Sequence, residues 1–288
     1  MKSLILFFAL GITSSISFCQ SDSTSNVLSD SVAKKSTLTL AAIYANNASY
    51  YGQKADVNTP YVALAAVYQL KSGFYFTGQS FKLLNDNTSS VSAAALGAGI
   101  NFKLGKKLTT DLSYSHSFYP AYSPLLQATN ADNASLVLSY DAWIKPSLAG
   151  DYAFGKTSDA FVTGGLSKSI NLFSISQKDI VTIGPSAEVV AGTQHFFQTY
   201  LTEKKLHDSV LGIARIPPVF GNPGSTSHAD TVTTTDFNIL SYNFKIPIAY
   251  NRSHYLVQAE YQLSLLSNHV QAKQQINSFL TFSFYYQF

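Results

Sequence analysis

The last twelve residues of the chain, 277–288, constrain its fold more than any other stretch. They read N-S-F-L-T-F-S-F-Y-Y-Q-F, with a large apolar or aromatic residue at every second position from Leu280 to Phe288. Because successive side chains of a strand point to opposite faces, this period predicts a strand with one aromatic face and one mostly polar face. In water such a strand invites edge pairing, whereas closure into a barrel within a bilayer removes the edge.

This stretch resembles the closing strand of bacterial outer-membrane β-barrels, which typically ends in phenylalanine behind alternating aromatic residues. The resemblance rests on a sequence motif at the end of the chain. Over the rest of the chain it rests only on the alternation of apolar and polar residues. It implies outer-membrane lipid as the surroundings and a terminus read by the barrel-assembly machinery during biogenesis. The residues that would carry this assembly signal are Phe282, Phe284, Tyr286 and Phe288.

Composition supports a barrel over a helical membrane protein. Charged residues make up 12% of the chain, about half the usual share of a soluble domain, and aromatic residues make up 14%. After the N-terminus, no stretch approaches the ~20 continuous apolar residues of a membrane-spanning helix. A large secreted β-sandwich remains the alternative. The net charge of +3 is small and basic residues cluster no further than doublets, so we expect no nucleic-acid partner.

The N-terminus predicts export. Residues 1–20 have the form of a cleaved signal peptide, with Lys2 before the apolar stretch 4–12. Together with the resemblance of the closing strand, this predicts a location in the outer membrane of a Gram-negative cell. Cys19 is the only cysteine, and its lipidation is an alternative to simple cleavage of the signal. Residues 21–36 are rich in Ser, Asp and Thr and are predicted to be a disordered periplasmic leader.

Alternating segments separated by polar Gly, Pro, Asn and Ser residues predict the strands of one domain over 37–288. We predict an all-β, transmembrane, antiparallel up-and-down β-barrel of about twelve strands, with 10 or 14 as alternatives. A turn is expected at 145–147, although 134–154 could be one long strand, and Gly184-Pro185 predicts a bend. The predicted strands are 37–45, 60–70, 74–84, 89–103, 108–119, 134–144, 148–155, 159–173, 180–200, 236–250, 255–265 and 277–288.

Connection lengths alternate between short and long, as in outer-membrane barrels with short periplasmic turns and longer outer loops. The longest connection, residues 201–235, is predicted to lie outside the membrane. It contains an apolar patch that would either fold inward as a plug or dock a protein partner at the outer loops. The residues of this patch are Ile213, Ile216, Val219 and Phe220.

Charged residues of both signs fall on the polar face of the predicted strands. Twelve strands enclose a lumen wider than the filled interior of an eight-stranded barrel and narrower than that of a sixteen-stranded porin. Mixed signs favour either a weakly selective pore or an interior closed by ion pairs. The predicted lumen-lining residues are Lys103, Asp111, Asp141, Lys145, Asp151, Lys168, Glu188, Lys245 and Glu260.

Aromatic residues at strand ends are expected to form girdles at the lipid headgroups. The residues assigned to these girdles are Tyr50, Tyr119, Tyr200, Tyr250 and Tyr286.

The leading functional interpretation is a passive channel for small hydrophilic solutes. The alternative is a closed structural or accessory barrel that docks a partner through its outer loops. A barrel-borne lipase or protease is less well supported, because adjacent residues such as His116 and Ser117 point to opposite faces of a strand and cannot pair as base and nucleophile. The sequence predicts no catalytic residue, no cofactor and no metal site.

Overall fold

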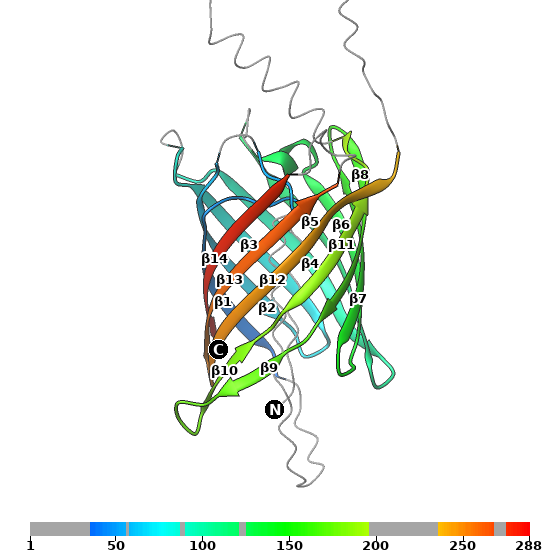
Figure 1. Cartoon of the computed structure of the whole chain (residues 1–288). Helices are drawn as coiled ribbons and strands as arrows, with labels where there is room; N and C mark the ends of the chain where they lie inside the picture. The colour runs from blue at the N-terminus through cyan, green and yellow to red at the C-terminus, as the bar shows by residue number, and fades with distance from the viewer. Residues whose placement is uncertain (1–34, 56–57, 87–89, 121–124, 196–235, 268–274) are drawn as a thin grey trace, which may run out of the picture.

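The structure is a computed structural model of the whole chain, and it describes residues 35–55, 58–86, 90–120, 125–195, 236–267 and 275–288. The predicted signal peptide, almost all of the leader and the loop 201–235 lie outside the described residues. Within the described ranges, fourteen strand segments form one antiparallel sheet that closes on itself (Figure 1).

The segments follow one another up and down around the barrel. The first seven are β1 (Thr37–Ala45), β2 (Tyr61–Gln69), β3 (Phe74–Leu83), β4 (Ala93–Leu104), β5 (Leu108–Phe118), β6 (Asp132–Tyr140) and β7 (Lys145–Phe154). The other seven are β8 (Ser158–Ser167), β9 (Ile170–Phe173), β10 (Asp179–Ile183), β11 (Ser186–Gly192), β12 (Asn238–Arg252), β13 (Tyr255–Leu266) and β14 (Ile276–Gln287). Because β9 continues β8 and β11 continues β10, the fourteen segments make a closed barrel of twelve strands. The predicted fold is confirmed.

The first and last strands close the barrel. β1 and β14 pair antiparallel from Thr39 opposite Gln287 to Ala45 opposite Thr281, and the Phe288 amide donates to the Leu38 carbonyl at 2.9 Å. The chain therefore enters β1 and leaves β14 at one end of the barrel, which we call the terminal end (Figure 1). The opposite end, which we call the loop end, carries the longer connections.

An apolar belt covers the outside of the barrel. Leu64, Leu96, Phe244 and Phe282 are 45–60% exposed, whereas their chain neighbours Ala63, Ala95, Asn243 and Ser283 are buried. Unpartnered apolar surface of this extent is unfavourable in water and matches the lipid-facing band of membrane barrels. The alternation read from the sequence is thus present around the barrel.

The inner face changes character along the barrel axis. Near the loop end it carries bulky apolar side chains, namely Phe81, Leu83, Phe161, Leu240 and Phe279. On the wall near the terminal end it carries small residues, namely Ser139, Ser147, Gly165, Ser167 and Ser186. Since small side chains leave volume in the lumen, open space is expected toward the terminal end.

Of two predictions about the course of single strands, one is wrong and one is confirmed. The turn expected at 145–147 is wrong, because the turn spans 141–144 and Lys145 begins β7. Pro146 is the second residue of that strand, opposite Leu166, where a missing N–H is tolerated. The interruption predicted at Gly184-Pro185 is present, between β10 and β11.

The girdle assignment is wrong for two tyrosines. Tyr50 is buried in a cluster inside the lumen, because the loop after β1 folds inward, and Tyr119, directly after β5, packs against a second buried cluster. Tyr286 lies on the outer face, and Tyr250 contacts the Tyr255 ring at 6.0 Å between centroids. Tyr200 lies outside the described residues.

Candidate functional site in the barrel lumen

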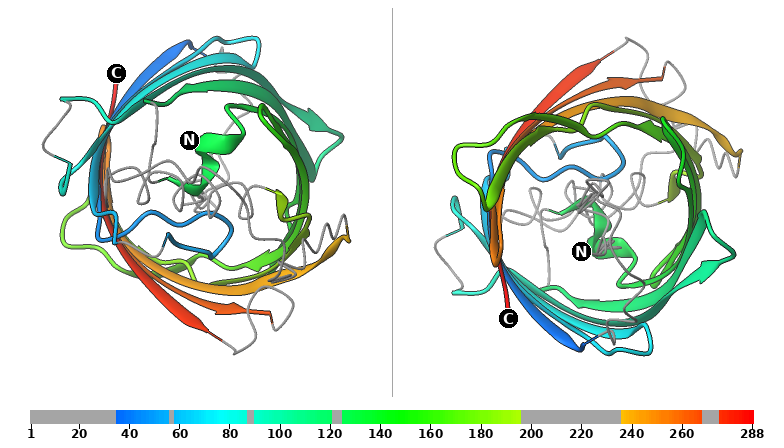
Figure 2. Two further views of the ribbon diagram at one scale, coloured as in Figure 1. Left: turned by 90° about the horizontal axis from the view of Figure 1, so that it is seen from above. Right: turned by 90° about the horizontal axis from the view of Figure 1, so that it is seen from below.

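Two loop segments, residues 46–55 and 125–131, fold into the barrel at its loop end, and together we call them the plug. Figure 2 shows both inside the ring of strands when the barrel is viewed along its axis. The second contains the 3₁₀-helix Leu126–Thr129. Apolar side chains of the plug and the wall form one buried cluster, composed of Tyr50, Tyr51, Ala55, Leu126, Ala153, Phe161, Val190 and Leu240. The plug therefore narrows the lumen at the loop end.

Phe161 of β8 lies at the centre of this cluster. It is 1% exposed, and its ring stacks on that of Tyr51 with 3.9 Å between centroids and meets the Tyr50 ring edge-on at 5.7 Å. Such aromatic pairs contribute about 0.5–1.5 kcal/mol each beyond the burial of area. Burial also raises the pKa of the Tyr50 and Tyr51 hydroxyls well above the ordinary value, so the plug carries no tyrosinate.

A tight turn presents the tip of the first plug segment to the wall. Tyr51 and Gly52 both have positive φ, 53° and 85°, as the central residues of a type I′ turn require. The Tyr51 carbonyl accepts from Ser241 Oγ at 2.7 Å, and the Gly52 carbonyl accepts from Asn277 Nδ2 at 2.9 Å. A side chain at position 52 would place its Cβ 2.5 Å from an oxygen of the wall, so only glycine fits.

Asp159 of β8 fastens the second plug segment. Its side chain is fully buried and accepts hydrogen bonds from Asn130 Nδ2 at 2.9 Å, Thr193 Oγ1 at 2.6 Å and the His195 amide at 2.9 Å. Hydrogen bonds to a charged group contribute about 1.5–3 kcal/mol each. The carboxylate thus joins the plug to the wall and to the segment after β11.

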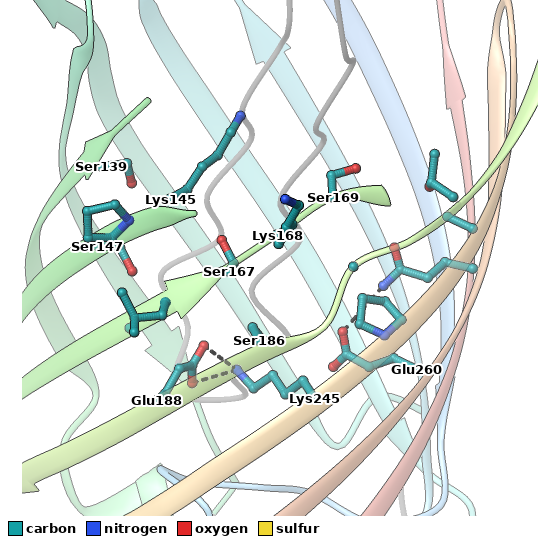
Figure 3. Close-up of a pocket in the computed structure, with 18 of the residues that line it drawn as sticks. Ser139, Lys145, Ser147, Ser167, Lys168, Ser169, Ser186, Glu188, Lys245 and Glu260 are labelled. Atoms are coloured by element: carbon teal, nitrogen blue, oxygen red, sulfur yellow. Dashed lines mark hydrogen bonds and ion pairs between the residues drawn. The ribbon is translucent and has the colours of Figure 1, made fainter. Parts of the chain in front are cut away.

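On the terminal side of the plug, a cavity of about 140 Å³ lies against the wall from β6 to β13 (Figure 3). The lack of a side chain at Gly165 leaves space in the cavity, because a Cβ at this position would lie only 2.7 Å from Ser147 Oγ. Hydroxyl groups surround the cavity, from Ser139, Ser147, Ser167, Ser169, Thr182 and Ser186.

The strands are interrupted beside the cavity, between β8 and β9 and between β10 and β11. Pro247 lines the cavity, and Pro185 lies between the lining residues Gly184 and Ser186. Neither proline has an N–H to donate to a neighbouring strand. Lone hydrogen bonds bridge the interruption, from the Lys168 amide to the Pro185 carbonyl at 3.0 Å and from the Gly184 amide to the Pro247 carbonyl at 2.9 Å. The break between β8 and β9 lies at the same level and brings Lys168 to the cavity.

Charged groups of both signs line the cavity. Lys245 of β12 is 2% exposed, and its ammonium contacts the Glu188 carboxylate of β11 at 2.8 Å. Glu260 of β13 lies beside this pair and is 3% exposed. Lys145 contacts Asp141 at 3.2 Å, and the Lys168 ammonium lies over the Trp143 ring, 3.2 Å from its centroid.

The cavity accounts for five of the nine lumen candidates named from the sequence, namely Lys145, Lys168, Glu188, Lys245 and Glu260. Two others face inward elsewhere. Asp111 accepts from the Tyr75 hydroxyl at 2.8 Å, and Asp151 hydrogen bonds with Tyr51 of the plug. Lys103 is exposed near the terminal end of β4, and Asp141 lies in the turn 141–144 rather than on a strand.

Gly99 of β4 lets Tyr75 of β3 reach across the wall to Asp111 of β5. A Cβ at position 99 would lie 2.5 Å from the Tyr75 ring and 2.8 Å from a carbonyl oxygen of Leu112. The inner-face glycine therefore makes room for a side chain on the neighbouring strand.

Replacing Gly99 by alanine should displace the Tyr75 ring, break its bond to Asp111 and cost about 1–3 kcal/mol of unfolding free energy. Urea unfolding in lipid would measure the change. Gly150→Ala is the matched control, since a Cβ there meets nothing within 4 Å and should leave stability unchanged. Equal effects of the two substitutions would contradict this role for Gly99.

The sequence also predicted a possible plug within the connection 201–235, and this stays a prediction. The patch of Ile213, Ile216, Val219 and Phe220 lies outside the described residues. The plug that is described comes from shorter connections, and its main signal in the sequence was the Tyr50-Tyr51-Gly52 run, where two large rings precede a glycine in a polar loop.

The described residues form few arrangements that would support a hydrolytic site or a metal site. His116 Nδ1 lies 2.6 Å from Asp132 Oδ1 on the outer face, while Ser117 is buried on the inner face. No group of three His, Cys, Asp or Glu residues there could hold a metal ion. In the same part of the chain, no helix is long and apolar enough to cross a membrane.

No family model matches the sequence, and no curated protein matches it. Solved structures share the general shape. The KdgM porin is 9% identical with a TM-score of 0.48, covering 87% of this chain and 99% of that one. LpxR from Salmonella typhimurium is 10% identical with a TM-score of 0.44, covering 86% and 99%. The NanC porin is 9% identical with a TM-score of 0.43, covering 86% and 98%. At such values, no function transfers from them to this chain.

Proposed function

We propose that this protein is a channel of the bacterial outer membrane for small hydrophilic solutes, narrowed at the loop end by its plug. The observation that carries the proposal is the lumen itself. A closed barrel with an apolar outside encloses a cavity lined by hydroxyl and charged groups, and such a lining is suited to polar solutes.

The proposal includes the orientation of the barrel. Short turns at the terminal end would face the periplasm and the longer connections would face outward. The alternating aromatic residues Phe282, Phe284 and Tyr286 lie on the outer face of β14, and Phe288 follows them, as a signal for assembly into the membrane would require.

Recording in planar lipid bilayers tests the proposal. We expect the purified, folded protein to produce small, discrete conductance steps, since the plug leaves a narrow path. Heat-modifiable electrophoretic mobility would verify that the barrel is folded. Folded protein that gives no steps at any applied voltage would overturn the channel.

A closed structural or accessory barrel is the second candidate, and the plug is the observation that favours it. The cluster around Phe161 and the Asp159 hydrogen bonds fix both plug segments to the wall. In that case, neither the natural protein nor a variant with a loosened plug would conduct. Conductance that appears only when the plug is loosened would instead indicate a gated channel.

A further inference from the structure

Among the described residues, every turn at the terminal end contains or adjoins a basic residue (Figure 1). All of these side chains are exposed except that of Lys145, which is half-buried. Together we call them the basic rim. In chain order its members are Lys71 after β2, Lys106 and Lys107 after β4, Lys145 after β6, Lys178 after β9 and Arg252 at the end of β12.

The carboxylates at the terminal end do not balance this charge. The described ones are Asp141, which contacts Lys145 at 3.2 Å, and Asp179, which accepts from the backbone amides of residues 175 and 176 at 2.7 and 2.9 Å. Positive charge is therefore concentrated at the terminal end. At the loop end the balance is reversed, and the described charged residues there are Asp86, Asp132, Asp159 and Asp236 against Lys54, Lys82 and Lys156.

Outward-facing aromatic rings lie directly beside the basic rim. Tyr68 and Phe74, both exposed, flank the turn of Lys71. The Lys107 ammonium lies 5.8 Å from the centroid of the Tyr140 ring, which is exposed as well. Aromatic rings at the border of an apolar belt occupy the headgroup level of the bilayer, and long basic side chains reach toward the same level. The basic rim is thus at the level of the lipid phosphates.

The distribution of the basic rim favours lipid over a macromolecular partner. Its turns follow one another in strand order around the closed sheet, so that basic residues lie on all sides of the barrel. A globular acidic protein would contact only one sector of such a ring, whereas lipid headgroups surround a barrel completely. Each Lys or Arg near an anionic membrane surface strengthens the attraction about fivefold, and salt weakens it.

We propose that the basic rim selects anionic phospholipids, such as phosphatidylglycerol, from the leaflet at the terminal end. The ammonium and guanidinium groups contact the headgroup phosphates, and the adjoining aromatic rings hold the barrel at that depth. In the orientation proposed above, this leaflet is the periplasmic one. The inference goes beyond the channel and does not depend on conduction.

The only tryptophan of the chain, Trp143, reports on lipid at the rim, since it is exposed and the Asp141 amide of its turn donates to the Lys107 carbonyl at 2.8 Å. The folded protein would be placed in vesicles of phosphatidylcholine and phosphatidylglycerol, with the acyl chains of one or the other brominated to quench fluorescence. We expect phosphatidylglycerol to be enriched about threefold or more around Trp143 at low salt. In 1 M salt, where the Debye length is ~3 Å, the enrichment should largely disappear. Equal quenching by the two lipids at low salt would overturn the proposal.

The double substitution Lys106→Gln and Lys107→Gln should remove most of this enrichment, and both side chains are exposed, so the barrel should still fold. Lys54→Gln with Lys156→Gln is the matched control, because it removes two charges at the loop end and should leave the enrichment unchanged. Full enrichment in the first variant would overturn the role of the rim.

A soluble polyanion distinguishes lipid from an acidic macromolecule. The protein in neutral detergent would be titrated with heparin. Saturable heparin binding without enrichment of phosphatidylglycerol in vesicles would overturn the lipid assignment and indicate an acidic macromolecule instead. Enrichment without conductance would overturn only the channel, and conductance without enrichment would overturn only the lipid site.

Discussion

Replacing Phe161 by alanine should lower the free energy of unfolding by about 3–5 kcal/mol, the usual cost of deleting a buried phenylalanine. The ring is 1% exposed and holds both plug tyrosines, so its loss removes the stacking with Tyr51 and the edge contact with Tyr50. A loosened plug should also raise single-channel conductance several-fold. Urea unfolding in lipid and planar-bilayer recording measure the two effects.

The adjacent residue provides the control. Val162 lies on the same strand, is 42% exposed and points to the outer face, so Val162→Ala should leave conductance unchanged. If Phe161→Ala folds but conducts no better than the natural protein, then the plug does not limit the lumen. Destabilisation without increased conductance would then favour the closed accessory barrel.

Replacing Phe244 by arginine should destabilise the barrel by about 2–4 kcal/mol, because a cationic side chain at the middle of the bilayer is costly. Phe244 lies in the middle of β12, between Ala187 and Leu263 of the neighbouring strands, and is 45% exposed on the outer face. The change would be measured as a shift of the urea midpoint for folding into lipid vesicles.

Phe237→Arg is the matched control for this prediction. Phe237 precedes β12 at the loop end and is 51% exposed, and the same substitution near the interface costs only about 0–1 kcal/mol. The comparison separates depth in lipid from loss of the aromatic ring. Equal destabilisation at both positions would contradict a lipid-facing Phe244 and would favour a second protein layer over this face.

The face of a strand to which each side chain points could be predicted well, because it depends only on residues adjacent in the chain. Phe244 points outward and Asn243 inward for the same reason that Phe282 and Ser283 do, since the strand period depends only on neighbouring peptide units. The interruption at Gly184-Pro185 was likewise readable, because proline lacks a donor wherever it stands. The turn near Pro146 was misplaced because proline marks both turns and strand starts, and the choice between them depends on pairing with β8.

The plug and the cavity could not be predicted in this way. A tyrosine at a strand end, such as Tyr50, packs against lipid or turns into the lumen according to the residue it meets, here Phe161 from a distant strand. The ion pair of Glu188 and Lys245 likewise depends on the register of β11 against β12. That pairing engages the Lys245 ammonium, and among the described residues Glu260 forms no ion pair of its own.

The sequence by itself determined that this chain forms a barrel with an apolar outside and a polar inside, because alternation along a strand is a property of neighbouring residues. Only the tertiary structure decided which loops enter the lumen, which charges pair and where the cavity lies. These outcomes depend on contacts between residues far apart in the chain, and closure of the sheet is what brings them together.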